Sequence, residues 1–220
     1  MIKGLLFDMD GTLVDNLSYH ILSFNSFAEK HNLKLVEPFD LRYNGMRGEE
    51  IFPRILAPEV LEKYTVQQLN DMKEEAYRES YAGHVVPIEG LMEFLRSAYD
   101  GGARSAIGSS GQRLNVEFIL NEIPFGELIS ASVSGDDVSR GKPNPDIFLR
   151  CCELLGTKPE ESIVFEDAIT GIKAGVAAGC KVVGITTTAP AEVLREAGAH
   201  YIIDDYRGLT LEKLAAELGM

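Results

Sequence analysis

The run KGLLFDMDGT, residues 3–12, decides how this chain is read. Its first half is a short apolar run that meets acid and glycine at once, which is typical of a buried β-strand ending in a turn. Asp8 and Asp10 stand two residues apart at the end of that strand. Two carboxylates there are costly unless a cation lies beside them, and carboxylate oxygens suit Mg²⁺. The run therefore predicts a strand with a metal-binding end; the alternative interpretation is a solvated acidic turn.

The next part of the chain, residues 16–84, has only helical patterns. They cover residues 17–28, 51–56 and 66–80, where apolar side chains recur with the spacing of one helix face. Asn16 or Asp15 is placed to cap the first helix. We find no credible strand in this segment, so it is expected to be an all-helical insertion.

From Pro87 onward, strand-like and helix-like segments alternate. Strands are expected at residues 103–108, 128–133, 162–165, 181–185 and 201–203, with helices between them and a last helix over 209–218. This alternation predicts right-handed crossovers and a parallel sheet, an α/β fold of the Rossmann-like kind. We expect residues 1–15 and 85–220 to form the catalytic core and 16–84 a small helical cap. Ligands of such sheets bind beyond the carboxyl ends of the strands, under the inserted cap.

Composition excludes several classes of protein. The chain has 220 residues, 45% of them hydrophobic, and a formal net charge of -13, which disfavours binding to nucleic acid. No apolar stretch approaches the ~18 residues of a membrane span, and the N-terminal run is too short for a signal peptide. The three cysteines have neither metal-ligand spacing nor an even count. We therefore expect reduced, packed thiols in a cytoplasmic protein with no membrane partner.

Two segments are suited to holding a phosphate group. Gly11 permits a sharp turn, and the amides that follow, beginning at Thr12, are placed to face an anion. Ser109 follows the expected strand at 103–108, and its hydroxyl and the amides of Ser110 and Gly111 at the next helix start form a phosphate cradle. Serine is also a common helix cap, so this second feature is weak by itself.

Two further segments place charge at the same edge of the predicted sheet. Lys142 lies in the run GKPNP, residues 141–145, whose prolines fix the backbone and hold the lysine in place. Glu166 and Asp167 end the strand expected at 162–165, where adjacent acids make poor core residues and indicate a cation. A lone lysine is more often a solvated surface residue, so Lys142 gains weight only from the other motifs.

Taken in order, the chain carries Asp-x-Asp-Gly-Thr, a strand ending in serine, Lys-Pro-x-Pro, and a strand ending in Glu-Asp. This order resembles the haloacid dehalogenase superfamily over the whole chain. The helical insertion after the first motif resembles the small cap of its β-phosphoglucomutase and phosphoglycolate phosphatase-like branch. The resemblance implies a phosphatase that uses Mg²⁺.

The resemblance also implies a role for each motif residue. Asp8 is then the nucleophile and a Mg²⁺ ligand, and Asp10 is the general acid and base, with its backbone carbonyl on the metal. An aspartyl phosphate on Asp8 splits one hard step into two, while Asp10 first protonates the leaving oxygen and then activates water.

The other motifs are implied to bind phosphate and metal. Ser109 would bind the transferring phosphoryl group, and Lys142 would hold the charges of the nucleophile and the phosphate together. Glu166 and Asp167 would complete the magnesium site. Which of these two acids is the direct ligand stays open.

The cap region contributes weaker candidates. His20, on the first cap helix, matches the place of a histidine in β-phosphoglucomutases. Arg47, with Gly45, lies in a loop that family caps turn toward the substrate, and arginine suits a phosphate or carboxylate clamp. The mutase pattern has its arginine one residue later, where this chain has Gly48. Arg113, just after the serine motif, is placed to line the cavity.

Three functions remain open. A hydrolase would use water to cleave a sugar phosphate or another small phosphorylated metabolite. A β-phosphoglucomutase would pass the same phosphoryl group to a sugar hydroxyl, and a degenerate member would only bind or regulate. The complete set of motif residues argues against the third, and Asp10 disfavours a dehalogenase, whose branch typically lacks that second aspartate. We expect a monomer or a weak homo-oligomer.

Overall fold

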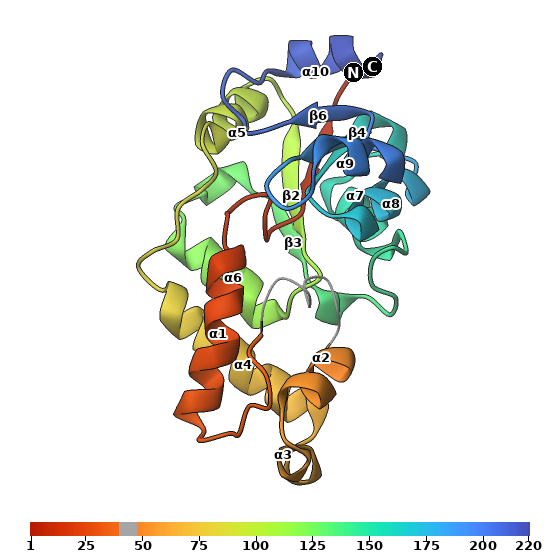
Figure 1. Cartoon of the computed structure of the whole chain (residues 1–220). Coiled ribbons are helices and arrows are strands. Elements are labelled where there is room, and N and C mark those ends of the chain that lie inside the picture. Colours follow the sequence, from red (N-terminus) through yellow and green to blue (C-terminus); the bar gives the residue numbers. More distant parts are fainter. Residues whose placement is uncertain (40–47) are drawn as a thin grey trace. The chain divides into compact units, whose positions relative to one another are not determined.

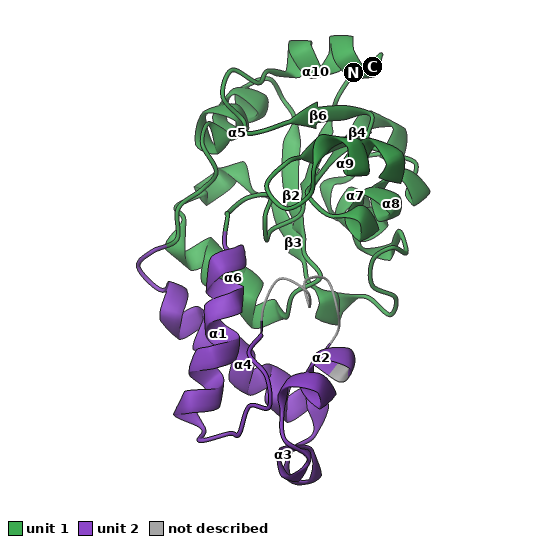
Figure 2. Ribbon diagram, in the orientation of Figure 1, with its two compact units in different colours: residues 1–15, 85–220 green, residues 16–84 purple. Residues whose placement is uncertain are grey.

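A computed structural model of the chain describes residues 1–39 and 48–220. The chain forms two compact units (Figure 2). Residues 1–15 and 85–220 make up the first and residues 16–84 the second. That the first is catalytic and the second a cap stays a prediction.

The first unit is built on a six-stranded parallel sheet with the order β3-β2-β1-β4-β5-β6. Figure 1 labels β2, β3, β4 and β6 of this sheet. The strands are β1 (Gly4–Phe7), β2 (Arg104–Gly108), β3 (Ala131–Val133), β4 (Ser162–Glu166), β5 (Lys181–Ile185) and β6 (Tyr201–Ile203). The chain runs from β1 outward to β3 and then returns to the other side of β1 with β4. The predicted Rossmann-like α/β fold is confirmed, and its topological switch point lies between β1 and β4.

Helices follow the strands of the sheet. They are α5 (Leu91–Asp100), α6 (Arg113–Glu122), α7 (Asp146–Leu155), α8 (Ile169–Ala177), α9 (Ala191–Ala197) and α10 (Leu211–Leu218). Helices α7 and α8 pack against a core that includes Leu6, Val164 and Cys152. Since side chains alternate along a strand, Phe7 and Phe165 point to the opposite face, where they stack on each other with ring centroids 4.6 Å apart and pack against α5.

Several boundaries differ from the sequence prediction by a few residues, and two of these differences have a clear local cause. The strand expected from Leu128 begins only at Ala131, because residues Gly126–Leu128 form a 3₁₀ turn in which the Leu128 amide donates to the Phe125 carbonyl. The last helix begins at Leu211, where the hydroxyl of Thr210 caps it by accepting from the Lys213 amide. All three cysteines are free and buried, as expected.

The second unit contains α1 (Leu17–Lys30), α2 (Gly48–Ile55), α3 (Pro58–Lys63) and α4 (Val66–Tyr81). Asn16 stands at the start of α1 but its side chain does not cap the helix, and its side-chain amide lies 2.6 Å from the Tyr77 hydroxyl. Helix α4 has a complete capping box between Thr65 and Gln68. Within the described residues, none of the helices has the length and apolar character needed to span a bilayer.

Candidate active site

The first and fourth motifs meet because of strand register. Phe7 at the end of β1 pairs with Phe165 of β4, so Asp8 comes level with Glu166 at the carboxyl edge of the sheet. The Asp8 amide donates to the Phe165 carbonyl at 3.0 Å, which fixes the backbone of Asp8 to the neighbouring strand. The two acids therefore flank the switch point, where open α/β sheets bind their ligands.

Lys142 joins these two acids. Its ammonium group contacts Oδ1 of Asp8 and lies 2.7 Å from Oε1 of Glu166, and the lysine side chain is only 5% exposed. Burial lowers the pKa of Lys142, but the carboxylates of Asp8 and Glu166 more than offset this effect and hold the pKa above its usual value. Lys142 is therefore a permanent cation between two strand ends.

Three buried carboxyls gather at this edge. Ligand oxygens of Asp8, Glu166 and Asp167 all lie within 4.8 Å of one another. Burial raises the pKa of Asp8 well above its usual value despite the attraction of Lys142. Burial, with the charge of Glu166, also raises the pKa of Asp167 to about 7. If all three carboxyls ionise, the ammonium group of Lys142 balances only one of their three negative charges. The remaining negative charge and the carboxylate oxygens fit Mg²⁺.

The two adjacent acids differ in what they contact. One carboxylate oxygen of Glu166 accepts from the Lys142 ammonium group, and the other accepts from the Ala168 amide at 2.9 Å. The side-chain partners of Asp167 are hydroxyls, with Oδ1 3.5 Å from the Thr12 hydroxyl and a further bond from Thr188. Hydroxyls bring no formal charge, so among the described residues Asp167, unlike Glu166, has no direct ion pair with a lysine, although the nearby charge of Lys142 lowers its pKa.

The serine motif forms a tight loop after β2. The Ser109 amide donates to the Val133 carbonyl at 3.0 Å, and the Gly111 amide donates to the Ser109 hydroxyl oxygen at 3.0 Å. Since that oxygen is an acceptor here, the hydroxyl proton is available for a phosphoryl oxygen. A β-carbon at Gly111 would lie 3.9 Å from Oδ2 of Asp10, so the first and second motifs approach each other. Asp10 is half-buried, unlike Asp8.

The turn after Asp10 corrects one expectation. The amide of Gly11 donates to the Val14 carbonyl at 2.7 Å, and that of Thr12 to the Met9 carbonyl at 3.2 Å. Both amides are used inside the turn and do not face an anion. Gly11 adopts a φ of +75°, and a β-carbon there would overlap the Asp167 carboxyl group. These two residues shape the turn against Asp167.

Other contacts in the first unit were not expected from the sequence. The Thr187 hydroxyl donates to the Gly11 carbonyl and the Tyr206 hydroxyl to the Thr12 carbonyl. Arg113 was expected to line the cavity, but its guanidinium donates to the Ser132 hydroxyl at 2.9 Å and contacts Asp137. Arg113 thus joins the start of α6, which follows the serine motif, to β3.

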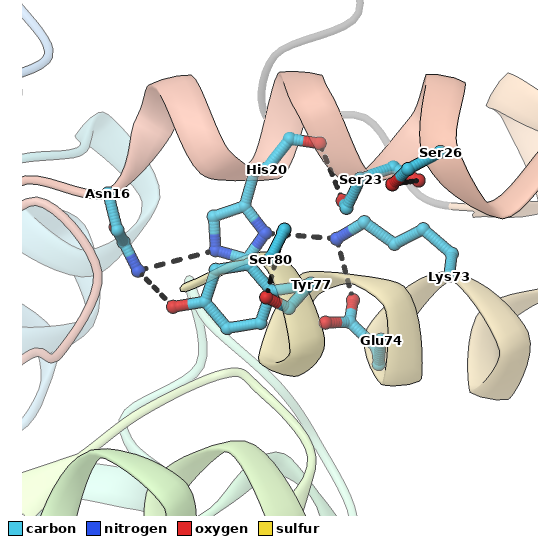
Figure 3. Close-up of polar contacts among 8 residues, drawn as sticks. All are labelled: Asn16, His20, Ser23, Ser26, Lys73, Glu74, Tyr77 and Ser80. Carbon is cyan, nitrogen blue, oxygen red and sulfur yellow. Dashed lines mark hydrogen bonds and ion pairs between the residues drawn. The ribbon is translucent and has the colours of Figure 1, made fainter. Parts of the chain in front are cut away.

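The cap candidates are described only in part, because Gly45 and Arg47 lie outside the described residues. His20 belongs to a polar cluster between α1 and α4 (Figure 3). Its Nδ1 is 2.9 Å from the Lys73 ammonium, and its ring stacks on Tyr77 with centroids 4.1 Å apart. Lys73 also donates to Glu74 at 2.8 Å. His20 is therefore held in place by its own unit.

Comparisons with known proteins agree with this geometry. A family model described as haloacid dehalogenase-like hydrolase matches residues 5–185. A validoxylamine A 7'-phosphate phosphatase of Streptomyces hygroscopicus subsp. limoneus is 30% identical over 90% of this chain and 92% of its own length. A fructose-1-phosphate phosphatase of Escherichia coli (strain K12) is 30% identical over 83% of this chain and 95% of its own.

Solved structures show the same fold. CbbY from Rhodobacter sphaeroides, in complex with phosphate, superposes with a TM-score of 0.83 over the full length of both chains at 24% identity. At that identity the likeness concerns the fold.

Proposed function

The chain belongs to the haloacid dehalogenase-like hydrolase family, and on that basis we propose that it is a phosphatase that cleaves small sugar-like phosphate monoesters through a phosphorylated Asp8. One observation carries the proposal. Lys142 bridges the buried Asp8 and Glu166 beside Asp167, at the edge of the sheet where Ser109 also lies.

The first step transfers the phosphoryl group to the protein. A carboxylate oxygen of Asp8 forms a bond to phosphorus while the ester bond to the substrate oxygen breaks. Asp10 gives its proton to that leaving oxygen, so the product departs as an alcohol. Lys142 reduces the repulsion between the Asp8 carboxylate and the approaching phosphate, and the Ser109 hydroxyl donates to a phosphoryl oxygen.

The second step regenerates the site. Asp10, now a carboxylate, takes a proton from a water molecule whose oxygen bonds to phosphorus as the bond to Asp8 breaks. Inorganic phosphate leaves, Asp8 is again a carboxylate and Asp10 is again an acid. Different burial suits the two roles, because the half-buried Asp10 can exchange protons with water whereas the buried Asp8 is held on Lys142.

A magnesium ion fits the remaining charge. We assign Asp8, Asp167 and the backbone carbonyl of Asp10 as its ligands, and Mg²⁺ bound there would supply positive charge against the phosphate. Glu166 is the less suitable direct ligand, because both its oxygens already accept hydrogen bonds within the protein.

The substrate class follows from the relatives. Two proteins that are 30% identical to this chain are named for the removal of phosphate from a sugar or a sugar-like compound. We therefore propose a phosphorylated sugar or a similar small polyhydroxylated metabolite as the substrate.

The test measures two products in one reaction. The chain is incubated with Mg²⁺ and either fructose 1-phosphate or β-glucose 1-phosphate, and both inorganic phosphate and glucose 6-phosphate are followed. Release of phosphate that stops on chelation of Mg²⁺ supports the hydrolase. Glucose 6-phosphate with little free phosphate would identify a mutase instead, and no turnover of these or a wider panel of esters would leave a binding protein.

Two variants test the covalent route. Asp8→Asn should abolish turnover without lowering the melting temperature, because the amide keeps the shape of the carboxyl and removes one negative charge from a crowded group. Asp100→Asn, at an exposed position of the same unit, is the matched control and should keep full activity. Phosphate release by Asp8→Asn at the rate of the control would end the aspartyl phosphate mechanism.

A further inference from the structure

Two consecutive backbone carbonyl groups of the first motif accept hydrogen bonds from hydroxyls of segments that are distant in the sequence. The Thr187 hydroxyl, after β5, donates to the Gly11 carbonyl. The Tyr206 hydroxyl, after β6, donates to the Thr12 carbonyl at 3.0 Å. Neither contact is part of the strand ladder, and the second joins residues 194 apart in the sequence.

Tyr206 is fixed for this contact. Its side chain is fully buried and packs against Phe7, Phe94 and Phe165, with ring centroids 5.8 to 6.1 Å away. Its backbone amide donates to the Glu89 carbonyl at 2.9 Å. Burial, together with the negative charges of Asp167 and Asp8, raises the pKa of the Tyr206 phenol, which therefore stays a proton donor.

The segment that is held lies directly against Asp167. The Thr12 hydroxyl is 3.5 Å from Oδ1 of Asp167, and the α-carbon of Gly11 is so close that any side chain there would overlap the same carboxyl group. A shift of the Gly11–Thr12 backbone would therefore change the position of Asp167, which the proposed function assigns as a metal ligand.

We propose that Tyr206 and Thr187 are positioning residues that hold the Gly11–Thr12 backbone against Asp167 and so set the geometry of the carboxylate that takes the divalent cation. The inference rests on the proposed function only for its effect on turnover. Its effect on metal binding is separate, because binding can be measured without a substrate.

The test compares removal of single hydroxyls. Tyr206→Phe keeps the buried ring and removes the hydroxyl that donates to the Thr12 carbonyl. Thr187→Val removes the hydroxyl that donates to the Gly11 carbonyl, whereas Thr187→Ser keeps a hydroxyl there. Tyr99→Phe is the matched control, because the Tyr99 hydroxyl donates to the exposed Glu127 at 3.1 Å on the surface of the same unit. Binding of Mg²⁺ is measured by calorimetry, and the melting temperature is measured in chelator.

We expect Tyr206→Phe and Thr187→Val each to weaken Mg²⁺ binding by about tenfold, the effect of losing a hydrogen bond that helps to orient a metal ligand. Thr187→Ser and Tyr99→Phe should bind like the unaltered protein. With substrate, kcat should fall in the same two variants at saturating sugar phosphate with little change in KM. The melting temperature in chelator should fall by no more than about 2–4 °C, the effect of one lost hydrogen bond in a chain of this size.

Unchanged Mg²⁺ affinity in Tyr206→Phe and Thr187→Val would overturn the proposal, because the hydroxyls would then support only the fold. Failure of the unaltered protein to bind Mg²⁺ would overturn it as well. If the protein binds Mg²⁺ but hydrolyses no ester, the proposed function fails, while the calorimetry still decides whether these two residues position Asp167.

Discussion

The carboxyl group of Glu166 occupies the space that a side chain at Gly171 would need. A β-carbon built at Gly171, in the first turn of α8, overlaps the Glu166 carboxyl atoms. This close approach lets Glu166 stay buried while it accepts from Lys142 at 2.7 Å and from the Ala168 amide at 2.9 Å. Gly171 therefore belongs to the site although it has no functional group.

Gly171→Ala should inactivate the protein and destabilise it. In an ordinary helix the same change stabilises by about 1 kcal/mol, but here the added carbon must displace Glu166 and separate it from Lys142. We expect a lower melting temperature and a loss of roughly a hundredfold in phosphate release, as for a misplaced catalytic group. Thermal unfolding and steady-state kinetics measure the two effects.

A double-mutant cycle shows whether Gly171 acts through Glu166. Glu166→Ala should cost much less activity in the Gly171→Ala background than in the unaltered protein, because the carboxyl is already displaced. Equal costs in both backgrounds, or a Gly171→Ala protein that melts above the unaltered one, would contradict this explanation.

Lys142→Met should lower stability in the absence of metal. The change leaves Asp8 and Glu166 buried beside each other without their shared cation. Breaking a buried ion pair by removing one partner costs about 3–5 kcal/mol, which denaturant unfolding in chelator would measure. Asp8→Asn combined with Lys142→Met should recover part of the loss, and Lys158→Met, at an exposed lysine, should cost little. Equal stability of Lys142→Met and Lys158→Met would refute the electrostatic account.

Much of the fold follows from local patterns. The apolar runs at 3–7 and 162–165 end in acid, and parallel strands bring their carboxyl ends to one edge, so the sequence predicts that Asp8 and Glu166 lie at the same edge. That they share one site was implied by the family resemblance, and the pairing of β1 with β4 makes them neighbours. The helix periodicity of residues 17–28 and 66–80 likewise matches α1 and α4. Short elements were less predictable, since the strand expected from Leu128 loses its first residues to a 3₁₀ turn.

The partners of polar side chains were not predictable in the same way. The family resemblance placed Lys142 beside Asp8, 134 residues away, but only the packed structure shows that Lys142 also donates to Glu166. Thr187 follows β5 and Tyr206 follows β6, and nothing in the sequence around either residue indicates that its hydroxyl donates to a carbonyl of the first motif. Arg113 stands beside the serine motif, yet its guanidinium donates to the hydroxyl and the carbonyl of Ser132 in β3.

We expect His200, which directly precedes β6 at the edge of the sheet, to make the stability of the protein depend on pH. The Val182 amide donates to its Nδ1 at 3.1 Å, and the His200 amide donates back to the Val182 carbonyl at 2.8 Å. Partial burial, with the charge of Lys181, lowers the pKa of His200. The unfolded chain then takes up a proton at higher pH than the folded one. The resulting stability is present above about pH 6.5, the usual value, and is lost as pH falls through the folded pKa.

The measurement for His200 is the melting temperature between pH 7.5 and 5.5. The unaltered protein should lose more over this range than His200→Gln, whose side-chain oxygen accepts from Val182 without titrating. Parallel curves for the two proteins would mean that His200 has no part in the pH dependence.

Lys73 should set the proton position on His20. An ammonium group can only donate, so the contact of 2.9 Å makes Nδ1 of His20 the acceptor. The proton of the neutral ring is then on Nε2, which requires the Asn16 side-chain amide, 3.5 Å away, to turn its oxygen toward the ring. Nitrogen NMR shifts of His20 at pH 8 should report this tautomer in the unaltered protein and a mixture in Lys73→Met.

Lys73→Met should also lose about 1–3 kcal/mol of stability, because the buried ammonium pairs with Glu74 at 2.8 Å and lies over the Phe24 ring. Lys63→Met is the matched control, since that lysine lies over the Tyr64 ring on the same unit. A single Nε2–H tautomer that persists in Lys73→Met would show that Lys73 does not determine it.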